Sequence, residues 1–174
     1  VTGQPNAMGG REVGGMANML AAHMELGDSD HRRIVQQFWN SPAIAARSGL
    51  KAVDMFEAIH DGKIKAVWIM ATNPIVSLPD ADKAKQALQR CELVVVSDCV
   101  TKTDTNAFAH VLLPAAGWGE KDGTVTNTDR SVQLGRKAID PPGEARPDLW
   151  IINELARGIG LDWHYSHPRD VFNE

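Results

Sequence analysis

Two short apolar runs separated by a helix-like segment constrain the fold of this chain more than any other feature. The first run covers residues 65–71 and the second covers residues 93–97, with the helix-like residues 80–90 between them. Continuous apolar strands that alternate with helices are typical of a parallel sheet buried on both faces. We therefore expect an α/β fold in which a mostly parallel sheet is flanked by helices, as in Rossmann-like domains.

Local signals predict the remaining elements. A helix over 51–60 has Val53, Phe56 and Ile59 on one face, and glycine at position 62 suits the residue just past its end. Asp80 is available to cap the helix over 80–90. The other expected elements are helices at 16–24 and 34–39, a helical turn at 104–109, extended segments at 111–113, 124–127 and 131–134, a loop over the glycine-rich residues 3–15, and a final helix from Pro147 to about Gly158 that buries Leu149, Ile152, Leu155 and Ile159.

The length of the chain, 174 residues, suits one domain with a core of its own. We expect a single α/β domain over residues 1–174. Within it, residues 1–45 form a glycine-rich opening with weak helices, residues 46–162 form the α/β core, and residues 163–174 begin a linker to a next domain. Because the chain opens on Val1 rather than Met, we expect it to be cut from a longer protein.

Composition narrows the class of partner. The net charge of −4 argues against nucleic acid and against an anionic membrane surface. No apolar run approaches the roughly 20 residues that span a bilayer, and the start shows no signal-peptide pattern. Cys91 and Cys99 lack the spacing of a metal site, so we expect no metal ligand from this chain.

Polar residues follow both apolar runs. Asn73 follows the first run, and Ser97 and Asp98 end the second. In open parallel sheets ligands bind beyond the carboxyl ends of the strands, where a carboxylate can accept hydrogen bonds from a ribose or from guanine N–H groups. Asn73 precedes a proline, so it could equally be an ordinary turn residue, and both interpretations stay open.

Two basic residues, Arg11 and Lys121, lie in glycine-rich segments, where backbone N–H groups can approach an anion closely. Each also has an ordinary interpretation: a solvated surface charge for Lys121, and an ion pair with Glu12 for Arg11. The opening has no Gly-Lys-Ser/Thr, and the glycines of residues 117–123 lack the final spacing of GxGxxG. A phosphate-binding loop of the Walker type and a plain NAD-binding fold are therefore not expected.

Six motifs, in order along nearly the whole chain, resemble the molybdopterin oxidoreductase family. They are GQPNAMGGREVGG at 3–15, MATNP at 70–74, VSD at 96–98, LLPA at 112–115, EKDGTVTN at 120–127 and PGEARPD at 142–148. Within this family the opening motif is most similar to catalytic subunits of bacterial nitrate reductases of the assimilatory type.

The resemblance implies an enzyme that reduces nitrate to nitrite at molybdenum held by two molybdopterin guanine dinucleotides. It also implies a 4Fe–4S cluster outside this chain. Arg11 resembles an arginine near the molybdenum, where a guanidinium suits an oxyanion such as nitrate. The residues that the resemblance assigns to one guanine dinucleotide are Asn73, Ser97, Asp98, Lys121 and Asp148, with Thr72 and Asn127 as weaker candidates at adjacent motif positions.

The chain also departs from the family, because it lacks the cluster cysteines and the cysteine expected to ligate molybdenum. We therefore expect an internal cofactor-binding domain that is inactive alone. Its expected partners are the remaining domains of the same subunit, nitrate, and an electron-donor protein or subunit, in the cytoplasm. Two alternatives stay open: the formate dehydrogenase branch of the same family, which the opening motif with Arg11 disfavours, and a stand-alone, non-catalytic α/β binding module.

Overall fold

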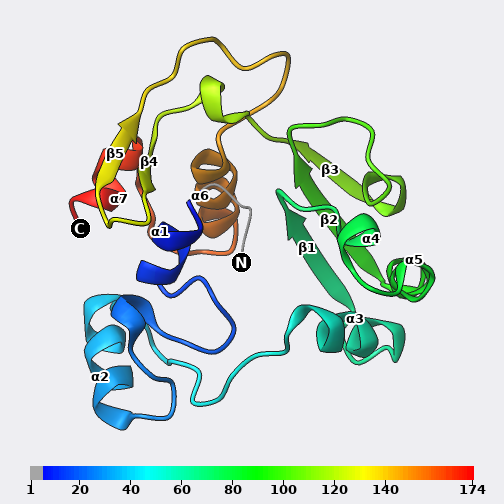
Figure 1. Ribbon diagram of the computed structural model, residues 1–174, viewed down its shortest axis with the longest axis horizontal. Coiled ribbons are helices and arrows are strands. Elements are labelled where there is room, and N and C mark those ends of the chain that lie inside the picture. Colours follow the sequence, from blue (N-terminus) through cyan, green and yellow to red (C-terminus); the bar gives the residue numbers. More distant parts are fainter. Residues whose placement is uncertain (1–5) are drawn as a thin grey trace. The chain divides into compact units, whose positions relative to one another are not determined.

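The computed structural model describes residues 6–174 (Figure 1). The chain divides into two compact units. One contains the chain up to Lys51 together with Thr124–Leu134, and the other contains Ala52–Gly123 together with Gly135–Glu174. Residues 1–45, expected as the opening segment of a single domain, fall within the first unit, and nothing in the sequence indicates that residues 124–134 join them. The extent of the domain in a complete protein stays a prediction.

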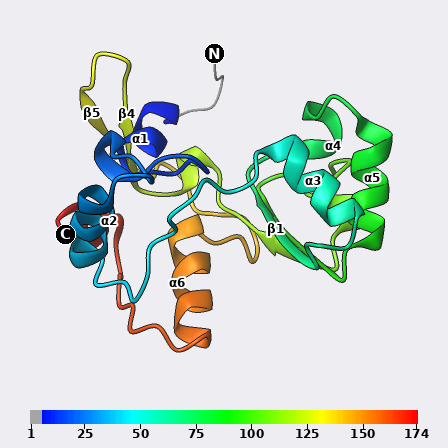
Figure 2. The ribbon, with the colours of Figure 1, turned by 90° about the horizontal axis from the view of Figure 1, so that it is seen from below.

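The second unit is built on a parallel sheet with the strand order β1-β2-β3. Figure 2 shows helices α3, α4 and α5 on one side of this sheet. The α/β class is confirmed, and so is the expected cap, because the Asp80 carboxylate accepts a hydrogen bond from the N–H of Lys83 at 3.0 Å. The elements are β1 (Ala66–Met70), β2 (Leu93–Asp98), β3 (Val111–Pro114), α3 (Ala52–His60), α4 (Pro74–Ser77), α5 (Ala81–Arg90), η2 (Asn106–Phe108) and η3 (Trp118–Glu120).

The core of this unit lies between the sheet and these helices. Val94 and Val96 of β2 are fully buried against Ile59 of α3 and Leu88 of α5. Because side chains alternate along a strand, Leu93 and its same-face neighbours on β2 point to the opposite side of the sheet. Leu93 is 43% exposed, so the sheet is sealed by tight packing on one side only.

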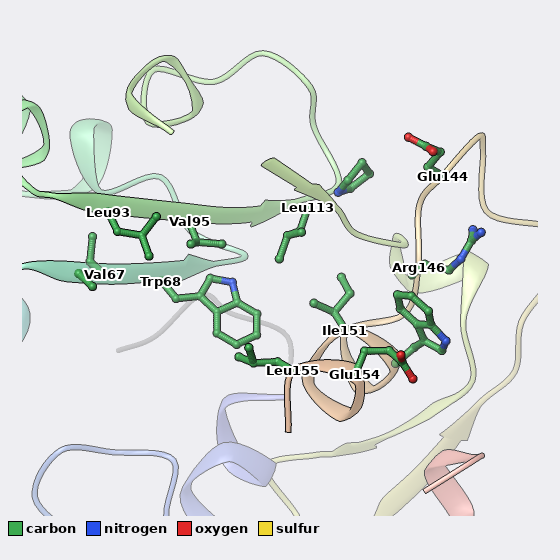
Figure 3. Close-up of a pocket in the computed structure, with 13 residues that line it drawn as sticks. Val67, Trp68, Leu93, Val95, Leu113, Glu144, Arg146, Ile151, Glu154 and Leu155 are labelled. Carbon is green, nitrogen blue, oxygen red and sulfur yellow. The ribbon is translucent and has the colours of Figure 1, made fainter. Parts of the chain in front are cut away.

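Helix α6 (Asp148–Gly158) lies on that opposite side, across a cavity of about 730 Å³ (Figure 3). The expected buried face of this helix is wrong: Leu155 is 48% exposed and Ile159 is 69% exposed, whereas Ile151 and Ala156 are buried. The reason is that Leu155 faces the cavity and Ile159 lies beyond the end of the helix.

Residues 163–174, expected to begin a linker, contain helix α7 (Pro168–Phe172). Its start is capped by side chains. The Asp170 carboxylate accepts hydrogen bonds from the N–H groups of Ser166 and His167, each at 2.9 Å, and the proline occupies the first turn. Local capping therefore forms a short helix where no apolar periodicity predicts one.

The first unit contains α1 (Ala7–Glu12), where the sequence predicts a loop; residues 3–5 of that expected loop lie outside the described residues. The glycines here allow close packing inside a helix. A Cβ at Gly9 would lie 2.2 Å from Oδ1 of Asn6, and this oxygen accepts a hydrogen bond from the N–H of Thr126 at 2.8 Å. The Asn6 side chain thus packs against Gly9 and links the start of α1 to Thr126.

Two further expectations in this unit are wrong in extent. Over 16–24 only η1 (Ala21–His23) is helical, because Ala22 and His23 both have positive φ, which ends any regular helix. The helix expected at 34–39 is α2 (Ser29–Phe38), which begins earlier because the Asp28 carboxylate accepts from two N–H groups of its first turn.

The two extended segments expected at 124–127 and 131–134 are confirmed as β4 (Gly123–Thr126) and β5 (Val132–Gly135), which form a two-stranded sheet. A small apolar cluster of Leu20, Leu26 and Val35 supports the first unit. Among the described helices, none has the length and apolar content that crossing a membrane requires.

Candidate functional site at the carboxyl edge of the sheet

The three parallel strands end at one edge of the sheet, where several candidate residues lie. The register pairs Met70 with Ser97 and Asp98 with Pro114. Just past β1, the N–H of Ala71 donates to the carbonyl oxygen of Ser97 at 3.0 Å. The prediction that the first two strand ends lie side by side is therefore confirmed.

A fourth extended segment prolongs this edge. Ala115 and Arg146 form a parallel bridge, and the N–H of Arg146 donates to the carbonyl oxygen of Pro114 at 3.0 Å. Asp148 begins α6 two residues further on. The edge thus gathers polar residues from both segments of the chain that make up this unit.

Asn73 is held by a buried threonine. The hydroxyl of Thr105, which is fully buried, donates to Oδ1 of Asn73 at 2.7 Å and accepts from the N–H of Ile75 at 3.3 Å. Asn73 occupies the N-cap position of α4, yet its side chain makes no capping bond. Within residues 6–174 no hydrogen bond uses the amide nitrogen of Asn73, so its two N–H donors are available to a ligand.

The side chain of Ser97 is buried and has a partner within the protein. It is 1% exposed, and its hydroxyl accepts a hydrogen bond from the indole Nε1 of Trp68 at 2.8 Å. Sequence reasoning missed both Trp68 and Thr105, because neither lies near its partner along the chain. This geometry favours Asp98 over the Ser97 hydroxyl for contact with a ligand.

Asp98 stands at the end of β2 in a turn that its own carboxylate stabilises. Oδ1 accepts from the N–H of Val100 at 3.0 Å, and among the described residues nothing donates to Oδ2. A half-buried carboxylate with one oxygen fixed and the other available suits N–H or O–H donors of a ligand.

Lys121 and Asp148 form an ion pair with each other. Their side chains are 29% and 32% exposed, so the pair is partly shielded from water. Asp148 lies in the first turn of α6, where unpaired N–H groups favour negative charge. The structure thus brings together two residues that the resemblance assigns to the same cofactor, although 27 positions separate them.

The loop that carries Lys121 is tied to the chain returning after β5. Asp122 Oδ1 accepts from the N–H of Lys137 at 2.8 Å, and Asp122 Oδ2 lies 3.3 Å from Nε2 of His167. The Lys137 N–H, and after it His167, hold the pKa of Asp122 below its ordinary value of 3.8. These contacts fix the backbone immediately beside Lys121.

Arg11 lies in the first unit, exposed on α1. The ordinary interpretation of Arg11, an ion pair with Glu12, is wrong. Glu12 instead pairs with His23 at 3.2 Å and with Arg130 at 3.1 Å, and no ion pair within the described chain involves Arg11. The guanidinium is therefore available to an anion.

Asn127 also lies in the first unit, where it closes the turn between β4 and β5. Its N–H donates to the carbonyl oxygen of Ser131 at 2.9 Å, and its side-chain amide donates to the Ser131 hydroxyl at 3.3 Å. These bonds give Asn127 a structural task. Thr72, in contrast, is exposed in the turn after β1, directly before Asn73. The roles of both residues toward a cofactor stay predictions.

The cavity between the sheet and α6 is a separate feature (Figure 3). Its size falls in the range of small-molecule sites. However, its walls are mainly apolar side chains such as Trp68, Leu93 and Leu155, with Glu144, Arg146 and Glu154 at one end. None of the sequence-predicted site residues lines it among the residues described, and its apolar walls do not suit a phosphate-bearing ligand.

Comparison with known proteins identifies the family. Residues 4–158 match the molybdopterin oxidoreductase family. Over its whole length the chain is 53% identical to a nitrate reductase of Klebsiella oxytoca, of which it covers 20%. It is also 41% identical, over 99% of its length, to the F420-dependent formate dehydrogenase subunit alpha of Methanocaldococcus jannaschii, of which it covers 25%. The chain therefore spans about a fifth to a quarter of the length of these relatives.

A solved structure supports the fold. Acetylene hydratase from Pelobacter acetylenicus superposes with a TM-score of 0.59 over 67% of this chain and 16% of its own. The two sequences are 24% identical in the aligned region, so this likeness supports the architecture alone.

Proposed function

The chain belongs to the molybdopterin oxidoreductase family, and from this premise we propose that it holds one guanine dinucleotide of the molybdenum cofactor in a nitrate reductase. The observation that carries the proposal is the polar edge of the sheet. Asn73, Asp98 and the Lys121–Asp148 pair all belong to the second unit and lie at or beyond the carboxyl ends of its extended segments. This is where open α/β sheets bind nucleotides.

The available groups fit this ligand chemically. The amide of Asn73 offers donors to carbonyl or ring-nitrogen acceptors of a base, and Oδ2 of Asp98 accepts from base N–H groups or ribose hydroxyls. Lys121 offers positive charge to a diphosphate, and Asp148 can accept from a hydroxyl once the pair opens. When bound, the cofactor supplies the two-electron oxygen-atom transfer from nitrate.

Arg11 is proposed to bind the substrate. A guanidinium presents paired donors that match a planar oxyanion, and the Arg11 side chain is not neutralised by Glu12. In the full-length enzyme, Arg11→Lys should raise the KM for nitrate more than it lowers kcat, since positive charge remains while the paired donors are lost. An unchanged KM for nitrate would remove Arg11 from this role.

The test of cofactor binding uses Asp98→Asn in the full-length enzyme. We expect the rate at which the purified protein loses guanine nucleotide during dialysis to rise about tenfold, because a charge-assisted hydrogen bond is lost. The matched control is Asp82→Asn on the outer surface of α5, where the carboxylate is 87% exposed. Loss of nucleotide at the wild-type rate from Asp98→Asn would contradict the proposal.

A second candidate is formate oxidation, which the similarity to a formate dehydrogenase subunit favours. Steady-state kinetics of the full-length enzyme with nitrate and with formate decides between the two. The sequence of the complete reading frame tests the remaining alternative, a stand-alone binding module: the enzyme proposal requires cluster-binding cysteines upstream of this region. We further propose that the enzyme is of the assimilatory type and lies in the cytoplasm. Cell fractionation tests the compartment.

A further inference from the structure

The buried threonine behind Asn73 has no part in the proposed function, and its hydrogen bonds carry a further conclusion. Thr105 has one hydroxyl proton and is fully buried, so that proton needs an acceptor inside the protein. Its oxygen already accepts from the N–H of Ile75. The acceptor for the proton is Oδ1 of Asn73, at 2.7 Å.

This arrangement determines which way the Asn73 amide faces. If the amide were turned over, its nitrogen would face the hydroxyl and the buried proton of Thr105 would lose its acceptor. The observed orientation therefore directs the carbonyl oxygen of the amide inward and leaves the nitrogen, with its two donors, free of protein partners among the described residues.

Thr105 also takes the place of the Asn73 side chain as the hydrogen-bond acceptor at the start of α4. An asparagine at the N-cap position ordinarily accepts a hydrogen bond from a backbone N–H of the first turn. Here the N–H of Ile75 is taken by the threonine hydroxyl instead, and the asparagine makes no capping bond.

The backbone that carries Thr105 is itself held firmly. Its carbonyl oxygen accepts from the N–H of Phe108 at 3.0 Å, at the start of η2. The next residue, Asn106, is 8% exposed, and its amide donates to the carbonyl oxygen of Val100 at 2.8 Å. Phe108 packs against the main apolar cluster. A side chain on such a support can orient a neighbour without moving.

We propose that Thr105 is a positioning residue that fixes the Asn73 amide with its N–H donors directed toward hydrogen-bond acceptors of the bound nucleotide. The inference rests on the proposed function, since it presumes that Asn73 contacts the cofactor. It adds that a residue without ligand contact controls the orientation of the Asn73 amide.

The experiment compares five variants of the full-length enzyme: Asn73→Ala, Thr105→Val, the double variant, Thr105→Ser and Thr103→Val. The readout is the rate of guanine nucleotide loss from purified enzyme during dialysis, measured as GMP released by acid from the retained protein. Thr103→Val is the matched control, because the Thr103 hydroxyl also accepts one backbone N–H, that of Asn106 at 3.1 Å, but makes no hydrogen bond to Asn73.

We expect Asn73→Ala to speed the loss about tenfold and Thr105→Val to speed it about threefold to tenfold, as for loss of one hydrogen bond. The double variant should lose nucleotide no faster than Asn73→Ala alone, because Thr105 acts through Asn73. Thr105→Ser, which keeps the hydroxyl, should restore the wild-type rate, and Thr103→Val should leave it unchanged.

Three outcomes would overturn the inference. A wild-type rate for Thr105→Val with a raised rate for Asn73→Ala would show that Thr105 does not position Asn73, and would leave the proposed function intact. A wild-type rate for Asn73→Ala would contradict the proposed role of Asn73 itself. Fully additive effects in the double variant would assign Thr105 a purely structural task.

Should Thr105→Val fail to fold, Asn73→Asp takes its place. This variant keeps an acceptor for the Thr105 proton and removes the outward donors, so the enzyme should fold with an unchanged melting temperature yet lose nucleotide as fast as Asn73→Ala. Retention at the wild-type rate would contradict the assigned direction of the amide.

Discussion

Replacing Ala71 with glycine should stabilise the sheet, although glycine normally weakens strands. Ala71 follows β1 with φ of 53°, in the left-handed region that disfavours a Cβ. Its side chain is exposed, so no packing is lost on substitution. Relief of the backbone strain is worth about 1–2 kcal/mol, and the greater freedom of glycine in the unfolded chain removes about 0.4–1 kcal/mol. The net expectation is a gain of about 0.5–1 kcal/mol.

The matched control is Ala66→Gly at the other end of the same strand, where the residue is also exposed but the backbone is extended. There glycine should cost about 0.5–1 kcal/mol. The two substitutions are chemically identical, so their opposite signs isolate the backbone effect.

Amide hydrogen exchange of the full-length apoprotein, read by mass spectrometry on peptides from β1 and β2, measures both changes locally. Ala71→Gly should slow exchange there about twofold to fivefold, and Ala66→Gly should speed it by a similar factor. If both variants speed exchange equally, the left-handed conformation of Ala71 after β1 is refuted.

Two other predictions concern the same unit. The first is a double-mutant cycle with Trp68→Phe and Ser97→Ala, whose side chains are joined by a hydrogen bond at 2.8 Å. Hydrogen exchange of β1 should give a coupling free energy of about 1 kcal/mol between the two substitutions. A coupling free energy near zero would show that the bond is not formed. The second is a pH dependence of stability that arises from Asp122. The Lys137 N–H, with a smaller effect of His167, lowers the pKa of Asp122 in the folded protein. The contribution of Asp122 to stability is therefore complete above its ordinary pKa of 3.8 and is lost as pH falls through the folded pKa. Asp122→Asn should flatten the decline of the melting temperature over this acid range, and an unchanged decline would contradict the assignment.

The second unit was largely predictable because its signals are local and repeated. The apolar residues of β1 and β2 identify buried parallel strands, and Asp80 marks the start of the helix between them. Since parallel strands end at the same edge, the positions of the two strands in the sequence were enough to predict that Asn73 and Asp98 lie at one edge.

What could not be predicted depends on contacts between distant positions. Thr105 and Trp68 are ordinary residues until the fold brings them to Asn73 and Ser97. The loop predicted for α1 is wrong for the same reason, because Asn6, whose side chain lies against Gly9, accepts its hydrogen bond from Thr126, 120 positions away.

The first unit was less predictable, because the start of α2 depends on a single capping side chain. Asp28 starts α2 five residues before the apolar pattern does, and no periodicity signals such a start. A capping residue can be recognised in a sequence, but one carboxylate among many polar residues is a weak signal.

The division of the chain has a consequence for synthesis on the ribosome. The second unit is interrupted, since the chain leaves it after Gly123 and returns at Gly135. Lys121 therefore emerges well before Asp148, and during that interval the ammonium lacks its carboxylate partner while the β4–β5 hairpin is made. A nascent chain that ends before α6 has the three strands but only part of the polar edge, so this edge is complete only after α6 has been translated.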